Sequence, residues 1–192
     1  MCRSRCAGCA SDRPRISPVV SVRRLLAWLL GGAAAASIGF FTAGVLVSQP
    51  EPAPDSLNTL TPFSLPTSSG ESFSSDQLAG QNILINFWAT WCAPCRREIP
   101  LLMATQALHR ESLAIVGIAV DELESVLRFE DEVGMNYVSL VNRNEALSLM
   151  SRYSNSGQLP FTLVFDRAGR LRFTKTGELH SKDIELWLSE LR

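Results

Sequence analysis

The apolar residues of the chain fall into two kinds of pattern. Continuous apolar runs of strand length stand at residues 83–88, 113–120 and 161–165. Such runs are typical of strands buried on both faces of a sheet, because a half-exposed strand alternates apolar and polar positions. The sequence therefore predicts a sheet with a buried centre.

The stretches between and after these runs carry apolar residues at helical spacing. We predict helices over residues 95–110, 122–133, 144–153 and 181–191. In the second of them, the positions that share the helical spacing are Leu123, Val126, Leu127 and Glu130. Helices that alternate with strands along a chain are typical of α/β domains.

Shorter segments complete the predicted sheet. Residues 137–141 predict a short strand, and the turn "DRAG" joins 161–165 to a strand at 170–176 as a hairpin. Residues 63–65 and 71–73, on either side of a Ser/Gly turn, predict a second short hairpin. The order β-α-β-α-β-α-β-β-α predicts an α/β domain with a mixed sheet.

Residues 25–48 are apolar or small and contain no charged residue. As a helix they would span about 36 Å, enough to cross a hydrocarbon core of about 30 Å. All six arginines of residues 1–48 precede this segment, and Asp12 is the one acidic residue beside them. Because basic residues stay on the cytoplasmic side, we expect a cytoplasmic basic tail over residues 1–24 and export of the rest.

We expect residues 25–48 to be a retained transmembrane anchor; a cleaved signal peptide is the alternative, since "AAAAS" offers a cleavage site. Residues 49–62 contain four prolines and predict an extended linker. We then expect residues 63–192 to form a domain on the periplasmic side of a bacterial inner membrane. Residues 49–192 carry twelve Lys/Arg and eighteen Asp/Glu, a balance that argues against nucleic acid as a partner.

Cys92 and Cys95 stand three apart, directly after the strand predicted at 83–88. A structural zinc site needs four ligands, and residues 49–192 add only His109 and His180, neither at zinc-finger spacing. A structural disulfide normally closes a longer loop, because a short loop removes little entropy from the unfolded chain. A redox-active pair is the third kind of site.

The redox interpretation accounts for more of the local pattern. A strand that gives way to a helix at this point places Cys92 at a helix N-terminus, where free N–H groups and the macrodipole stabilise a thiolate. We expect Cys92 to be exposed and to attack, and Cys95 to be shielded one turn inside the helix. Pro94 fits the first turn, where its missing N–H costs nothing. Trp91 either forms a wall beside the thiol or packs in the ordinary way.

A set of motifs resembles one known family, the TlpA/ResA-like family of membrane-anchored thioredoxin-fold thiol–disulfide oxidoreductases. The resemblance runs from about Phe63 to Leu191. It implies a thioredoxin fold with a mixed central sheet, an N-terminal β-hairpin extension and a β-α insertion. The motifs are "GQNILINFWATWCAPCRREIP" (80–100), "GIAVD" (117–121), "LPFTLVFD" (159–166) and "DRAG" (166–169).

The resemblance implies a role for each matching residue. Cys92 becomes the nucleophile and Cys95 the resolving thiol of a redox-active disulfide. Glu98 becomes a partly buried carboxylate that modulates the thiol pKa values and relays protons; the alternative is a solvated acid favoured by the helix dipole. Leu159 and Pro160 become the cis-proline loop, whose backbone pairs with a substrate strand.

The expected function is therefore an extracytoplasmic thiol–disulfide oxidoreductase that reduces or isomerises protein disulfides and supports cytochrome maturation. Trp91 and Pro94 are expected at the substrate contact beside the cysteines. Electrons would come from a membrane thiol carrier, and no cofactor or metal is implied. In the cytochrome-maturation subgroup an acidic residue often follows the proline, where this chain has Phe161. A peroxiredoxin-like peroxide reductase and a non-catalytic binding module are the alternatives.

Overall fold

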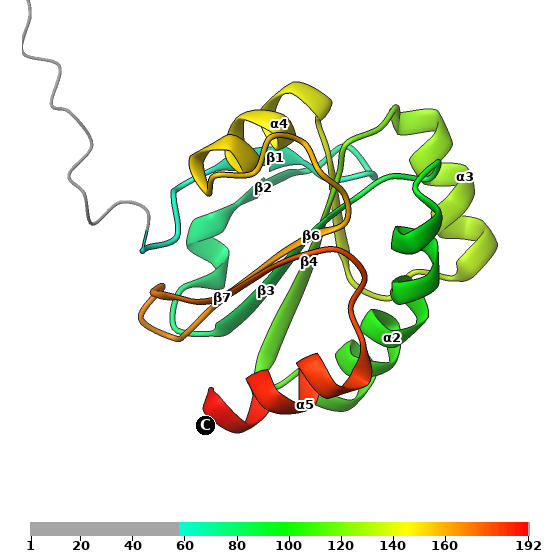
Figure 1. Cartoon of the computed structure of the whole chain (residues 1–192). Coiled ribbons are helices and arrows are strands. Elements are labelled where there is room, and N and C mark those ends of the chain that lie inside the picture. Colours follow the sequence, from blue (N-terminus) through cyan, green and yellow to red (C-terminus); the bar gives the residue numbers. More distant parts are fainter. Residues whose placement is uncertain (1–57, 192) are drawn as a thin grey trace, which may run out of the picture. The chain divides into compact units, whose positions relative to one another are not determined.

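The central sheet has the strand order β5-β4-β3-β6-β7 in the computed structural model, which describes residues 58–191 (Figure 1). In β3, β4 and β5 the strands run parallel, whereas β6 and β7 run antiparallel to their neighbours, so the sheet is mixed as predicted. The strands are β3 (Asn82–Trp88), β4 (Leu113–Ala119), β5 (Val138–Val141), β6 (Phe161–Phe165) and β7 (Leu171–Thr176).

Helices cover both faces of this sheet. Figure 1 shows α2, α3 and α5 on one side and α4, with the hairpin β1–β2, on the other. β5 adds an edge strand and α4 follows it, a β-α unit of the kind that the resemblance implies as an insertion. The bounds are β1 (Ser64–Pro66), β2 (Ser72–Ser74), α2 (Ala93–His109), α3 (Leu123–Val133), α4 (Arg143–Arg152) and α5 (Ser181–Glu190).

The predicted N-terminal hairpin is confirmed. β1 pairs antiparallel with β2, with Ser64 opposite Ser74, and a bridge between Thr67 and Leu140 joins the hairpin to β5. A short 3-10 helix, Ser75–Leu78, follows β2 and was not predicted. The hairpin therefore closes the apolar face that α4 leaves open.

β3 is the centre of the molecule, and all seven of its residues are buried. Its side chains alternate between two cores: Ile85 and Phe87 pack toward α4 and the hairpin, whereas Leu84 packs toward α2 and α5. Asn86 and Trp88 share the α2 side by the same alternation. The polar position inside an apolar run therefore faces the helix that carries the cysteines.

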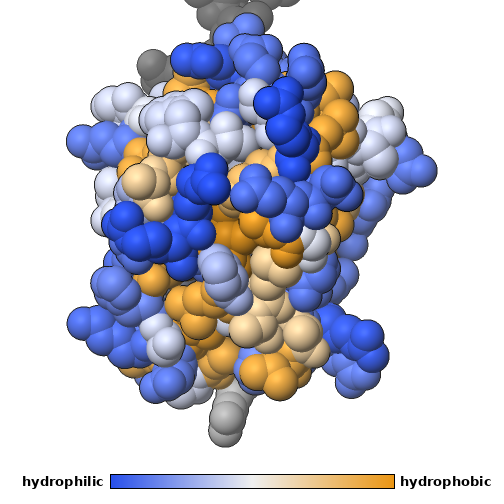
Figure 2. Space-filling view, turned by 90° about the vertical axis from the view of Figure 1, so that its right-hand side faces the viewer, coloured by the Kyte–Doolittle hydropathy of each residue, from blue (hydrophilic) through white to orange (hydrophobic). Residues whose placement is uncertain are grey.

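The outward sides of α2 and α3 are partly apolar. In α3, Val126 and Phe129 are buried, while Leu123 and Leu127 are 47% and 44% exposed. Of the three apolar positions expected on one helix face, Leu123, Val126 and Leu127, only Val126 is buried. Phe129 is the other buried residue of this helix. Leu108 in α2 is exposed as well. Figure 2 shows apolar side chains gathered over the middle and lower part of the face on which α2 and α5 lie.

The end of the predicted linker is bound to the domain. Leu60 N–H donates to the Gly169 carbonyl at 2.7 Å, and Leu171 N–H donates to the Asn58 carbonyl at 2.7 Å. The basic tail, the predicted anchor and linker residues 49–57 lie outside the described residues. Among residues 58–191, none of the helices is both long enough and apolar enough to cross a bilayer.

Candidate active site

The loop between β3 and α2 brings the two cysteines together. Cys92 is the N-cap of α2, and its Sγ accepts a hydrogen bond from the Cys95 N–H at 3.3 Å. The two residues form a disulfide, with their Cα atoms 5.3 Å apart. Pro94 lies in the first turn of α2, as predicted. The N-terminus of α2 therefore offers its N–H groups and dipole to the Cys92 sulfur, an arrangement that stabilises a thiolate.

Both cysteines are nearly covered in this oxidised form. Cys95 is 0% exposed and Cys92 is 5% exposed. The expectation that Cys92 is exposed is therefore wrong here, because its side chain belongs to an apolar cluster with Trp88 and Ala89. Cys92 is still the one of the two that reaches the surface, so a substrate sulfur has access to Cys92 first.

The residues before Cys92 are held against the start of α3. The Thr90 N–H and hydroxyl both donate to Oδ2 of Asp121, at 2.8 and 2.6 Å. Asp121 is buried and belongs to the "GIAVD" motif, so this motif anchors the loop that precedes Cys92. Trp91 is 64% exposed, so ordinary core packing does not describe it. The loop therefore presents a large apolar ring to solvent directly beside Cys92.

Glu98 lies one turn after Cys95 on the buried side of α2 and is 1% exposed. Its two oxygens have separate donors: Asn86 Nδ2 donates to Oε1 at 2.7 Å, and the Leu179 N–H donates to Oε2 at 2.6 Å. The alternative of a solvated first-turn acid is therefore wrong. Because Asn86 comes from β3 and Leu179 from the loop before α5, this carboxyl group joins three elements beneath the disulfide.

Burial raises the pKa of Glu98 from 4.5 to about 7, against the effect of its two hydrogen bonds, which lower the pKa. The nearby Glu178 carboxylate also raises this pKa, and the Lys175 ammonium lowers it. Glu178 is itself paired with Arg97 of α2, with 2.9 Å between Nε and Oε2. A carboxyl group with a pKa near 7 can take up and release a proton at neutral pH.

The peptide bond between Leu159 and Pro160 is cis, which confirms the predicted cis-proline loop. The antiparallel register of β3 and β6 pairs Phe87 with Phe161, so Pro160 stands at the level of Trp88, near the cysteine end of β3. Leu159 packs against the apolar cluster that contains both cysteines. The loop that precedes β6 and the disulfide therefore lie at the same end of the sheet.

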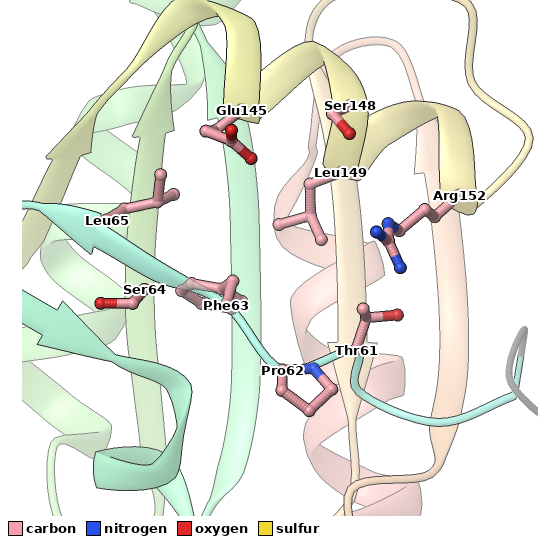
Figure 3. A pocket seen from close by; sticks show the side chains of 9 residues that line it. All are labelled: Thr61, Pro62, Phe63, Ser64, Leu65, Glu145, Ser148, Leu149 and Arg152. Atoms are coloured by element: carbon pink, nitrogen blue, oxygen red, sulfur yellow. The ribbon is translucent and has the colours of Figure 1, made fainter. Parts of the chain in front are cut away.

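A groove of about 220 Å³ lies elsewhere, between the chain at residues 61–65 and α4. Figure 3 shows Leu149 pointing from α4 toward this segment, with Arg152 above Thr61. None of the predicted site residues lines it. We therefore attribute the groove to the packing of the hairpin against α4.

Comparison with known proteins agrees with this geometry. The AhpC/TSA family matches residues 57–174, which is more than half of the chain. The chain belongs to this family. The thiol-disulfide oxidoreductase ResA of Geobacillus kaustophilus is 28% identical to it over 155 residues, which cover 80% of this chain and 83% of the relative.

Other relatives of this AhpC/TSA-family chain are also named as thioredoxin-like or thiol:disulfide interchange proteins. The thioredoxin-like protein YneN of Bacillus subtilis is 32% identical over 130 residues, covering 64% of this chain and 72% of that protein. A crystal structure of a thiol:disulfide interchange protein from Chlorobium tepidum has a TM-score of 0.64 at 28% identity, over 70% of this chain and 95% of the other. With its Cys92–Cys95 disulfide, the chain is a thiol:disulfide oxidoreductase of thioredoxin-like fold.

Sequence reasoning about this AhpC/TSA-family site missed the two partners of Glu98. Asn86 left one signal, as the polar side chain within "ILINFW". Leu179 left none, because it contributes a backbone N–H and lies 81 residues after Glu98. With these partners the site combines a disulfide at a helix N-terminus with a buried acid one turn deeper. It can therefore exchange electrons through sulfur and protons through the carboxyl group.

Proposed function

We propose that this oxidoreductase acts on protein disulfides outside the cytoplasm, tethered to the membrane by residues 25–48. The charge step around that segment supports export, because the basic residues precede it and the acidic domain follows it. The reducing or isomerising direction rests on resemblance, since the Ala-Pro pair between the cysteines is nearer to that of reducing thioredoxins.

One observation carries the proposed chemistry: Glu98 is buried one turn below the Cys92–Cys95 disulfide and titrates near neutral pH, with a pKa of about 7. A structural disulfide does not require a proton acceptor, and burying an acid destabilises the fold. A redox-active dithiol does require a proton acceptor, because its resolving thiol must lose a proton before it can attack.

In the proposed reaction the reduced protein begins as a Cys92 thiolate and a Cys95 thiol. The Cys92 thiolate attacks one sulfur of the substrate disulfide, which forms a mixed disulfide and releases the other substrate sulfur as a thiolate. Glu98 takes the proton of Cys95, whose thiolate then attacks the Cys92 sulfur. The substrate leaves with two reduced sulfurs and the protein becomes the disulfide seen here. A membrane thiol carrier then supplies the two electrons that restore the dithiol.

The cis-proline loop and Trp91 are proposed to hold the substrate. The peptide beside Pro160 offers backbone groups to an extended substrate strand, and Trp91 offers an exposed apolar ring next to the reacting sulfur. Pro94 would line the same contact. Apocytochromes are among the proposed substrates, but Phe161 is apolar and buried, so we propose no dedicated apocytochrome site.

The direction is tested by the reduction potential of the Cys92–Cys95 pair, measured by equilibration with a thiol buffer. Reducing thioredoxin has a potential of about −270 mV and the oxidant DsbA about −120 mV. A value at the low end of this range supports reduction or isomerisation. A value at the high end contradicts the proposed direction, and Cys92→Ser, which cannot form the pair, is the control.

The location is tested by fractionating cells that produce the full chain and a chain without residues 25–48. We expect the full chain in the membrane fraction, with the domain open to protease from the periplasmic side. A soluble product of the full chain whose N-terminus starts beyond Ala36 would show a cleaved signal, and a protease-protected domain would contradict export.

A further inference from the structure

Asn155 lies in the segment that leads from α4 to the cis-proline, and it is only 4% exposed. Its side chain is used fully. Oδ1 accepts from the Gly157 N–H at 2.9 Å and from the Gln158 N–H at 2.8 Å. Nδ2 donates to the Gln158 carbonyl at 3.2 Å and to the Thr176 hydroxyl at 3.3 Å. One buried amide therefore satisfies polar groups on two segments.

Residues 153–160 belong to no helix or strand, so these side-chain hydrogen bonds hold the backbone in place of helix or sheet hydrogen bonds. The segment turns sharply, with φ of 61° at Ser154 and 92° at Gly157, both in the left-handed region. An Asn side chain that bonds to N–H groups two and three residues later can set such a turn by itself. The amide of Asn155 therefore fixes the backbone of Gly157 and Gln158, directly before the Leu159–Pro160 bond.

The other side of the loop is fixed by β7. Thr176 pairs with Phe161 in the sheet, and its hydroxyl oxygen accepts a hydrogen bond from the side-chain amide of Asn155. The Gly177 N–H donates to the carbonyl of Pro160 at 2.8 Å. The loop is therefore held from both flanks, and Asn155 is its side-chain connection to the sheet.

We propose that Asn155 is a positioning residue, which sets the cis-proline loop for pairing with an extended polypeptide around the substrate disulfide. The inference rests on the proposed function, in which this loop holds a protein substrate. A small disulfide has no strand to pair with the loop and needs only access to the Cys92 sulfur. Asn155 therefore favours protein disulfides over small ones.

The test compares two substrates of the purified full-length protein: the disulfides of insulin and hydroxyethyl disulfide. The measured quantity is the ratio of kcat/KM for insulin to kcat/KM for the small disulfide. In Asn155→Ala this ratio should fall about tenfold, mainly through KM for insulin, because four hydrogen bonds that fix the loop are lost. Asn155→Asp keeps both acceptor bonds of Oδ1 but places its second oxygen against the Gln158 carbonyl, so its ratio should recover only in part, above that of Asn155→Ala and below that of the wild type.

Asn82 offers a matched control at the opposite end of β3. It is 5% exposed, and its Nδ2 donates to the carbonyls of Ser112 and Leu191, each at 3.2 Å. Asn82→Ala therefore removes an amide as buried as that of Asn155 but changes no contact of the cis-proline loop. Its ratio should stay at the wild-type value. A ratio that falls equally in Asn82→Ala and Asn155→Ala would assign Asn155 to general stability and overturn the inference.

Pro160→Ala separates this inference from the proposed function. If Pro160→Ala lowers the ratio but Asn155→Ala does not, the loop binds protein substrates and the inference about Asn155 is wrong. If neither variant changes the ratio, the loop does not select protein substrates, and both the inference and the proposed substrate contact fail. A lower ratio in both variants, with partial rescue by Asn155→Asp, is the expected result.

Discussion

Replacing Glu98 by Gln tests whether the buried carboxyl group titrates as the structure indicates. Its pKa is raised from 4.5 to about 7, chiefly by burial. Because the folded pKa lies above the unfolded one, the folded protein binds more protons than the unfolded chain between these two values. The free energy of unfolding is therefore highest, as far as Glu98 determines it, below pH 4.5, where the group is protonated in both states. It falls as the pH rises through about 7, because the buried carboxyl group must then ionise.

The magnitude follows from the difference between the two pKa values, 4.5 and about 7. At about 1.4 kcal/mol per pKa unit, the free energy of unfolding should fall by about 3 kcal/mol over this interval. Glu178 and Lys175, the charged neighbours that shift the pKa of Glu98, are unchanged in Glu98→Gln. The variant has nothing to titrate at residue 98, so this part of the slope should disappear.

The assay is urea unfolding of the oxidised fragment 52–192, whose described residues 58–191 form one compact unit, at intervals from pH 4.5 to pH 8.5. The Cys92–Cys95 disulfide keeps both thiols from titrating. In Glu98→Gln the new amide nitrogen cannot accept the Leu179 N–H, so the variant loses a hydrogen bond. The pH slope is therefore compared rather than the absolute stability.

Glu111→Gln, which removes an exposed carboxylate, is the matched control and should keep the wild-type slope. Parallel curves for the wild type and Glu98→Gln would refute the reasoning, because they would place no titration at Glu98 between pH 4.5 and 7.

Three further predictions concern the same region. In the reduced protein, Glu98→Gln removes a negative neighbour that disfavours a thiolate, so thiol alkylation should show a lower Cys95 pKa than in the wild type. An unchanged alkylation profile would contradict the coupling. Pro160→Ala should lower insulin reduction several-fold, with little change in urea stability; a large loss of stability alone would give the proline a structural role. Arg97→Ala leaves the Glu178 carboxylate uncompensated, so the pH midpoint of the Glu98 transition should move up; an unmoved or lower midpoint would separate this ion pair from Glu98.

The strands and helices could be predicted because their signals are local. The run 161–165 is the strand β6, and every predicted helix begins and ends within two residues of the observed bounds. Cys92 could be placed at a helix N-terminus because a buried strand and Pro94 frame it. The resemblance supplied the cis bond at Pro160, which no local pattern requires.

What could not be predicted depends on contacts between distant residues. The burial of Glu98 arises where β3 and the loop before α5 meet α2, and its partners lie 12 and 81 residues away. The near-complete burial of Cys92 depends on Trp88 and its neighbours in the folded core. Asn155 resembles an ordinary loop residue until its amide is seen against Thr176.

The most direct test of the central claim is a comparison of two single-cysteine variants of the full-length chain in bacterial cells. Cys95→Ser keeps the attacking thiol but cannot resolve the mixed disulfide, whereas Cys92→Ser cannot attack. Adducts are trapped by acid quenching, separated without reductant and identified by mass spectrometry. We predict that Cys95→Ser accumulates reductant-sensitive adducts with exported proteins and that Cys92→Ser accumulates few. Equal trapping by the two variants, or full activity of either variant with protein disulfides, would contradict the account.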